Sequence, residues 1–588
     1  MKIQYIIPVL SIVCSSLTLH AQKADSTLTR EMLLEREYSP TIREASRLHF
    51  LPEIKEPQIR KEAVEYSNYA TPFSIEPQIA ILASDAFYTD DIESKHKGYA
   101  GLGIASNLNI NGDLGYRILN KAKTQLDVYA SHRSANSNVK FLQSEQKQKM
   151  KMSDTWAALS FQHQFEPVKF FTDIKYTYSA FNYYGDSIPN EGILSSSPTL
   201  DRSILQVNNI FNWGIGVASN NQSDWNYNAK FSLVNFDRKY AIFESLEGPK
   251  ELITKLDADV NSRFSGDNKY GLAASLDGFF YDYIQLNSAI RYYSGYKDYM
   301  RLAINPYIEF SDLLWKVHLG AKLYTTFNNG RVFAFAPDLS FSVYSDESEL
   351  YLKAGGGVNA NSNYTVSQSN RYVSPQHRIV DSRTPLDGEF GYKMNIQRNF
   401  WFDVYVGYQI NKDTYFFRAE YPASMYPGNK VIAANVAVAD TMDANLFKVG
   451  VRARYQVQDF LEFGLKAQFN EWDVDNYDYS GNMASKAWNK PVFECEFTAG
   501  YKLPGIPFRM DLFSRFENGR KACVVLPTGP EVKTMKCIND VSVMATYAID
   551  EMFSIYGRVN NLLFQRYDLW YGYPAQGTNF MLGVNLKF

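Results

Sequence analysis

The sequence predicts an all-β protein, a transmembrane antiparallel β-barrel of about 22 strands. Three observations indicate this fold. Segments in which apolar and polar residues alternate recur along most of the chain, the connections between them are alternately short and long, and the final segment of this kind ends at Phe588. A barrel explains the alternation, because one face of each strand meets lipid while the other faces a polar interior.

The composition argues against a bundle of membrane helices. Aromatic residues are abundant, with 42 Tyr, 39 Phe and 8 Trp, yet the mean hydropathy is −0.32. Beyond the N-terminus, no stretch approaches the roughly 18 apolar residues that a membrane helix needs. The net charge of −3 gives no sign of a nucleic-acid partner.

Residues 1–21 have the pattern of a secretory signal peptide. Lys2 supplies the positive start, Ile6–Val13 are apolar, and a cut is expected after Ala21. Residues 22–97 are rich in charge and repeatedly interrupted by proline, which breaks helices. We expect this N-terminal segment to be short and irregular, and to lie in the periplasm or in the barrel lumen.

The barrel itself is predicted over residues 98–588. Clear alternation marks Trp315–Tyr324, Phe447–Val457 and Phe493–Lys502 as strands. Short connections such as 458–460 and 503–507 alternate with long ones, among them 183–202, 415–445, 472–490 and 518–536. Barrels of the outer membrane have short periplasmic turns and long external loops, so both chain ends are expected in the periplasm.

These features place the chain in the cell outer membrane, with outer-membrane lipid around the wall. In lipid an open sheet edge is not tolerated, so the last strand must pair with the first. The terminal aromatic Phe588, on an alternating strand, resembles the signal read by the bacterial barrel-assembly machinery. Gly355, Gly356 and Gly357 interrupt another strand, and we expect local bending or close packing there.

No motif for catalysis, metal binding or a cofactor is found, and we expect the protein not to be an enzyme. The seven His are scattered without metal-ligand spacing. Cys523 and Cys537 lie close together in one predicted loop and are the candidate disulfide. Aromatic residues of the long loops suggest either an interfacial girdle and self-packing loops or a binding surface; these candidates are Trp472, Trp488, Trp570, Tyr571 and Tyr573.

The last forty residues resemble the C-terminal end of TonB-dependent outer-membrane receptors, particularly those of Bacteroidetes. The residues that carry this resemblance are Gly557–Leu562, Tyr567, Gly572–Gly577, Asn579, Phe580, Gly583 and Phe588. The resemblance implies a barrel of the predicted size. It also implies a plug domain and a TonB box, but residues 22–97 are too few for the plug and Ala24–Leu28 are too polar for the box. Energised uptake through TonB is therefore not expected.

Two functions fit this sequence. In the first, a receptor-like barrel binds or admits a solute or partner at the cell surface. A barrel this wide would leak if empty, so residues 22–97 or inward-folded loops are expected to fill its lumen. In the second, a barrel without a plug is a structural or assembly scaffold that docks a periplasmic or surface protein partner.

Overall fold

The computed structural model describes residues 96–188, 199–220, 225–282, 296–328, 332–375, 379–396, 399–422, 430–475 and 486–588 of the 588-residue chain. The chain divides into two units, residues 1–70 and 71–588, and every strand named below belongs to the second. The predicted signal peptide and nearly all of segment 22–97 lie outside the described residues.

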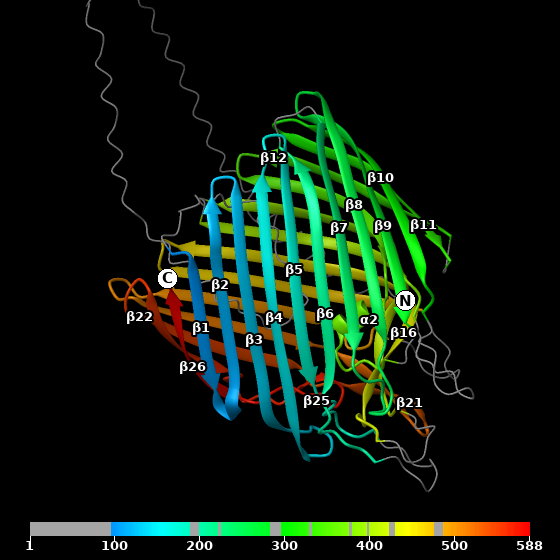
Figure 1. Ribbon diagram of the computed structural model, residues 1–588, viewed down its shortest axis with the longest axis vertical. Coiled ribbons are helices and arrows are strands. Elements are labelled where there is room, and N and C mark those ends of the chain that lie inside the picture. Colours follow the sequence, from blue (N-terminus) through cyan, green and yellow to red (C-terminus); the bar gives the residue numbers. More distant parts are fainter. Residues whose placement is uncertain are drawn as a thin grey trace, which may run out of the picture. The chain divides into compact units, whose positions relative to one another are not determined.

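Twenty-two strands form a closed antiparallel barrel, as the sequence predicted (Figure 1). Four of the 26 described strands, β20, β21, β24 and β25, lie outside this wall. The wall consists of β1 (Gly98–Ala105), β2 (Asn109–Lys121), β3 (Thr124–Lys140), β4 (Lys147–Gln164), β5 (Val168–Phe181), β6 (Gln206–Ser219), β7 (Trp225–Arg238), β8 (Lys250–Ser265), β9 (Asn268–Asp282), β10 (Tyr299–Ser311), β11 (Trp315–Phe327), β12 (Phe333–Ser345), β13 (Ser348–Asn359), β14 (Ser382–Ile396), β15 (Phe400–Glu420), β16 (Val436–Val457), β17 (Leu461–Val474), β18 (Phe493–Lys502), β19 (Phe508–Asn518), β22 (Ile538–Ala548), β23 (Phe553–Asn560) and β26 (Asn579–Lys587).

The first and last strands close the ring. β1 pairs antiparallel with β26, from Tyr99 opposite Lys587 to Ala105 opposite Met581. Beyond this ladder, the Gly98 amide donates to the Phe588 carbonyl at 2.8 Å and the Phe588 amide donates to the Gly98 carbonyl at 3.0 Å. Closure gives every wall strand two neighbours, which is the condition for placing a sheet in lipid.

The two faces of the wall differ as the alternation predicted. On β26, Phe580 and Leu582 are 60% and 75% exposed on the outer face, whereas Met581 between them is 4% exposed and faces inward. The same outward exposure of large apolar side chains recurs around the barrel, for example at Leu319 and Phe335. Such a face suits lipid and not water. Among the residues that the structure describes, no helix has the length and hydropathy of a membrane span.

The connections also follow the predicted alternation, with one correction. Turns such as 458–460 and 503–507 are short. The first residue of β1, Gly98, and the terminal residue Phe588 lie at the same end of the barrel as these turns. The predicted loop 415–445, however, is mostly strand, because β15 continues to Glu420 and β16 begins at Val436. Sequence alternation fails there because both faces are covered: neighbouring side chains Phe416 and Phe417 are both buried.

A hairpin covers this projecting part of the wall. β20 (Lys521–Leu526) and β21 (Gly529–Thr534) form the hairpin inside the predicted long loop 518–536. β20 pairs in parallel with the end of β15, where Arg418 lies opposite Cys523. The remaining elements are a single turn, η2 (Ser106–Leu108), the helix α2 (Asn363–Ser369), and a small ladder of β24 (Asp568–Trp570) and β25 (Tyr573–Pro574).

Candidate functional site

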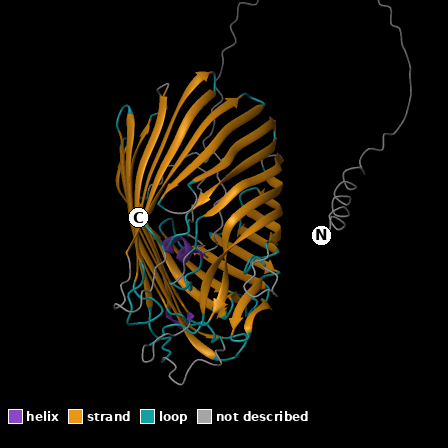
Figure 2. Ribbon diagram, turned by 90° about the vertical axis from the view of Figure 1, so that its right-hand side faces the viewer, coloured by secondary structure: helices purple, strands orange, loops and turns teal. Residues whose placement is uncertain are grey.

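Long connections gather at one end of the barrel, together with the helix α2 (Figure 2). Many of their described residues pack against one another, and together these form what we call the cap. The cap consists of residues 141–146, 182–188, 199–205, 239–249, 360–375, 379–381, 430–435 and 561–578.

The cap has an apolar core that reaches across the mouth of the barrel. Phe181, at the end of β5, and Val436, at the start of β16, belong to the same buried cluster although their strands are eleven places apart in a ring of 22. The cluster consists of Ala135, Val139, Phe141, Met150, Phe181, Tyr183, Tyr184, Ile242, Phe243, Tyr372, Val431, Ile432, Ala433, Val436 and Tyr573. Opposite sides of the barrel are therefore joined through one core.

Three tyrosines from three different loops form the centre of the cap. The Tyr573 ring stacks on Tyr372, with centroids 4.0 Å apart, and meets Tyr184 edge-on at 5.2 Å. The Tyr573 hydroxyl donates to the Asn435 carbonyl, and the Tyr184 hydroxyl donates to the Pro574 carbonyl at 2.9 Å. Burial raises the pKa of both phenols, so they stay neutral donors. Each ring thus fills space and satisfies a buried carbonyl.

The connection between β13 and β14 crosses the mouth and carries α2. Ser362 caps the helix: its side chain accepts from the Thr365 amide, and the Thr365 hydroxyl accepts from the Ser362 amide. The far end of α2 rests on the buried side chain of Arg238 from β7. That guanidinium donates to the Ser367 hydroxyl and to the Arg371 and Val373 carbonyls, each at 3.1 Å, and also to the Tyr183 hydroxyl.

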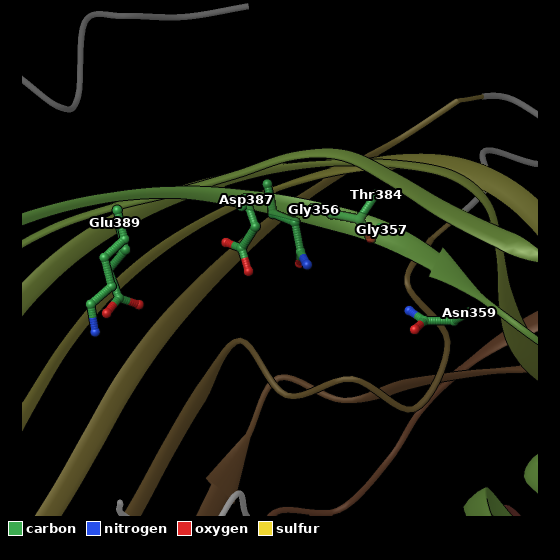
Figure 3. Close-up of a pocket in the computed structure, with 9 residues that line it drawn as sticks. Gly356, Gly357, Asn359, Thr384, Asp387 and Glu389 are labelled. Atoms are coloured by element: carbon green, nitrogen blue, oxygen red, sulfur yellow. The ribbon is translucent and has the colours of Figure 1, made fainter. Parts of the chain in front are cut away.

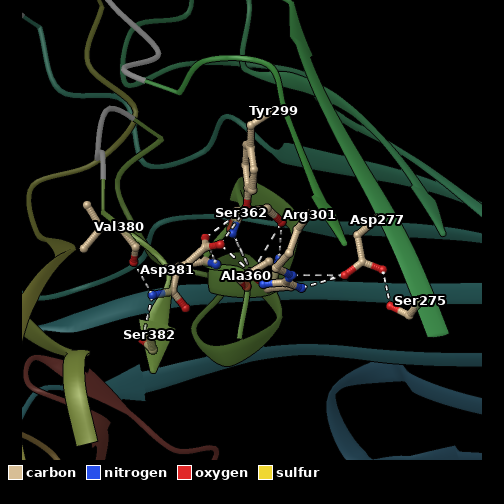
Figure 4. Close-up of polar contacts among 11 residues, drawn as sticks. Ser275, Asp277, Tyr299, Arg301, Ala360, Ser362, Val380, Asp381 and Ser382 are labelled. Carbon is tan, nitrogen blue, oxygen red and sulfur yellow. Dashed lines mark hydrogen bonds and ion pairs between the residues drawn. The ribbon is translucent and has the colours of Figure 1, made fainter. Parts of the chain in front are cut away.

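Two ion pairs fix the same connection to other parts of the wall. Arg371 pairs with Asp154 of β4 at 3.1 Å. On another side, Asp381 lies 3.3 Å from Arg301 of β10, which also pairs with Asp277 of β9 at 2.7 Å (Figure 4). The Tyr299 hydroxyl donates to Asp381 at 2.9 Å. Burial raises the pKa of the Asp381 carboxyl, and the Arg301 charge opposes that rise.

The chain can now be compared with known proteins. No protein-family model matches the sequence, and no curated protein matches it. Solved structures do match, and the three named here each cover 84% of this chain. The ferripyoverdine receptor of the outer membrane of Pseudomonas aeruginosa superposes with a TM-score of 0.60 at 13% identity and 72% of its own length, and the FrpB iron transporter of Neisseria meningitidis with 0.60, 12% and 82%. The ferric-catecholate import receptor Fiu of E. coli gives 0.59, 9% and 82%.

This chain has the barrel fold of TonB-dependent outer-membrane receptors. At identities of 9–13% the comparison establishes the fold. It agrees with the resemblance carried by the last forty residues and with the count of 22 wall strands. The lumen of this barrel carries polar contacts: Arg452, for example, pairs with the buried Asp403 at 3.0 Å.

The candidate aromatic residues fall into three clusters. Tyr573 and Trp570 pack in the cap, Tyr573 being only 1% exposed. Trp488 and Trp472 pack with Phe416 beside the hairpin of β20 and β21, while Tyr571 packs against a third cluster around Val524. All five contact other apolar side chains in these clusters. Trp472 belongs to β17, not to a loop as predicted.

The predicted disulfide between Cys523 and Cys537 is not formed. Cys523 lies opposite Val532 in the hairpin, five residues before Cys537. Cys537 lies beyond the end of the hairpin, between β21 and β22. Nearness in sequence was misleading because Cys523 pairs in the hairpin with Val532 instead.

The sequence shows no metal-binding motif. Within the described ranges, no group of three or more His, Cys, Asp or Glu side chains is placed to hold a metal ion. The residues that sequence reasoning missed are those at the centre of the cap, above all Tyr183, Tyr372 and Arg238. Tyr183 and Tyr372 come from separate loops and Arg238 from the end of β7, and no sequence signal joins them.

Proposed function

We propose that this chain is an outer-membrane barrel that binds or admits a solute or partner at the cell surface, and that its cap keeps the mouth closed in the resting state. One observation carries this proposal: the buried cluster that joins β5 to β16 across the ring. The outward apolar side chains support outer-membrane lipid as the surroundings, and the position of Phe588 at the end of β26 supports recognition by the barrel-assembly machinery.

The cap fits this role because of where its contacts lie. A barrel of this width would be an aqueous channel if nothing filled it. Here the filling material at one end comes from the loops of the barrel itself. The cap has features of a closed gate: a dry core around Tyr573, and polar fastenings at Arg371 and Asp381 that tie one connection to separate strands.

Conductance in planar bilayers tests the proposal. Deletion of residues 24–90 should leave the conductance low if the cap closes the barrel. The double variant Tyr573→Ala, Arg371→Ala should show large, frequent openings, because it removes both a central ring and a fastening. Tyr547→Ala, on the outer face of β22, is the matched control and should behave like the wild type. A large open channel from the deletion alone would show that the cap does not close the barrel.

The scaffold function has one observation in its favour. The cap joins opposite sides of the wall, so the end of the barrel that carries the loops forms a rigid surface. A partner protein can dock on this surface. Purification from native membranes separates the two functions. A stoichiometric protein partner favours the scaffold, whereas loss of growth on one particular solute after gene deletion favours uptake.

A further inference from the structure

We propose that a pocket in the barrel wall binds a small uncharged solute rich in hydroxyl groups. This inference rests on the proposed function and specifies the chemistry of the solute. The pocket lies on β13, β14 and β15 and is built around the three-glycine run Gly355–Gly357 (Figure 3). It has a volume of about 370 Å³, within the range of small-molecule sites.

Two adjacent irregularities in strand pairing shape this pocket. The register of β13 against β14 shifts between Gly355 and Gly357, and the register of β14 against β15 shifts between Arg383 and Leu386. Gly356 makes the first shift possible, because a Cβ at this position would lie 2.3 Å from the Thr384 carbonyl oxygen. Of the two alternatives expected at the glycine run, bending or close packing, the structure shows close packing, and a recess in the wall accompanies it.

The pocket lining is polar, and its charges are balanced only when the neighbouring Lys448 is included. The lining residues are Lys353, Gly355, Gly356, Gly357, Asn359, Thr384, Asp387, Glu389 and Gln409. The ammonium of Lys448 lies 3.3 Å from carboxylate oxygens of both Asp387 and Glu389. Lys353 adds a second positive charge and lies over the Tyr351 ring at 5.0 Å. Two lysines thus face two carboxylates, so a net charge on the solute gains little.

Hydrogen-bonding groups remain available around this balanced centre. The side-chain amides of Asn359, which is exposed, and of Gln409, which is half-buried, also line the pocket. Each amide offers donors and an acceptor, and the carboxylates of Asp387 and Glu389 add acceptors. Hydroxyl groups both donate and accept, so a solute that carries several of them can satisfy amides and carboxylates together. An apolar solute would leave these polar groups unpaired.

The position of the pocket relates it to the cap. Asn359 is the last residue of β13, and the connection that carries α2 begins at the next residue. A solute in the pocket therefore lies next to the segment that Arg371 and Asp381 fasten to the wall.

Binding is tested with the full-length protein in lipid nanodiscs, which leave both barrel ends open to solution. The probe is maltose, followed by saturation-transfer NMR and titration calorimetry, with glucuronate and glucosamine as charged comparisons. Gly355→Leu is the blocking variant, because a Cβ at Gly355 meets nothing within 4 Å and the longer side chain would fill the recess. Gly112→Leu is the matched control, since its Cβ meets only the Gly101 carbonyl oxygen at 3.9 Å.

We expect maltose to bind the wild type and Gly112→Leu alike, and Gly355→Leu to weaken binding by about tenfold or more. Gln409→Leu should weaken it by a smaller factor while keeping the barrel folded. Absence of maltose binding, equal binding by Gly355→Leu, or stronger binding of either charged comparison would overturn the proposal. Conductance does not enter this measurement, so its failure leaves the closed-gate function standing, and the converse also holds.

Discussion

Replacing Tyr573 by alanine should open the cap without unfolding the wall. The side chain is only 1% exposed, stacks on Tyr372 and donates to the Asn435 carbonyl. Truncation of a buried aromatic side chain destabilises by about 3–5 kcal/mol, and a buried carbonyl left without its donor adds about 1–3 kcal/mol. A total near 5 kcal/mol corresponds to an increase of about 10³–10⁴ in the open population of the cap, at about 1.4 kcal/mol per factor of ten.

Hydrogen exchange read by mass spectrometry measures this change peptide by peptide. Amides in residues 430–436 and 561–578 should exchange faster by that factor, up to the limit set by free exchange, while the β18 and β19 amides should be unaffected. Tyr573→Phe keeps the ring and loses one hydrogen bond, so an increase of only about tenfold is expected. Tyr547→Ala, on the outer face, is the control. Unchanged exchange in both cap segments of Tyr573→Ala would refute the role given to this ring.

Three further predictions concern other contacts. A double-mutant cycle of Arg371→Ala and Asp154→Ala should give a coupling of about 1 kcal/mol in cap exchange, since both side chains are partly buried; additive effects would contradict the ion pair. Burial raises the pKa of Asp568, whose ordinary value is 3.8, so the closed cap keeps this proton to higher pH than the open cap. Its stabilisation is complete below the ordinary pKa and is lost as pH rises through the raised pKa, so protection of residues 561–578 should fall as the pH rises above about 4. Asp568→Asn should flatten this dependence, and an unchanged slope would exclude Asp568 as its source. Deletion of Phe588 removes the terminal hydrogen bonds to Gly98 and should lower the yield of heat-modifiable, folded barrel several-fold on gels, whereas Phe588→Tyr should preserve it; equal yields would count against the terminal signal.

The wall could be predicted from the sequence because each of its strands reports its own environment. In β26, Leu582 is exposed on the outer face and Met581 is buried on the inner face. The alternation of residues along the strand predicts which side chains face outward. The prediction failed where the environment stopped alternating. The end of β15 is covered on both sides, so Phe416 and Phe417 are buried together and the strand resembled a loop.

The cap could not be predicted for a different reason. Its central contacts join Tyr184, Tyr372 and Tyr573, which belong to three loops far apart in sequence. Each loop alone shows only a few aromatic residues, and such residues also occur in interfacial girdles. The strands of the wall must first bring the loops together, and only then can the side chains of the loops form their contacts. The same limit applies to the pocket: the glycine run indicated bending or close packing, but not the register shift between β14 and β15 beside it.

The buried core that joins β5 to β16 has a mechanical consequence for the wall. In a ring of 22 strands, each joined only to its two neighbours, little resists flattening of the circle into an oval. The core shared by Phe181 and Val436 acts as a strut across the diameter. We therefore expect the circular cross-section of the barrel and the closure of its mouth to be coupled. A change that weakens this core should also let the barrel change its cross-section. A change in the lateral pressure of the surrounding bilayer would then alter the closure of the cap through the strands that hold it.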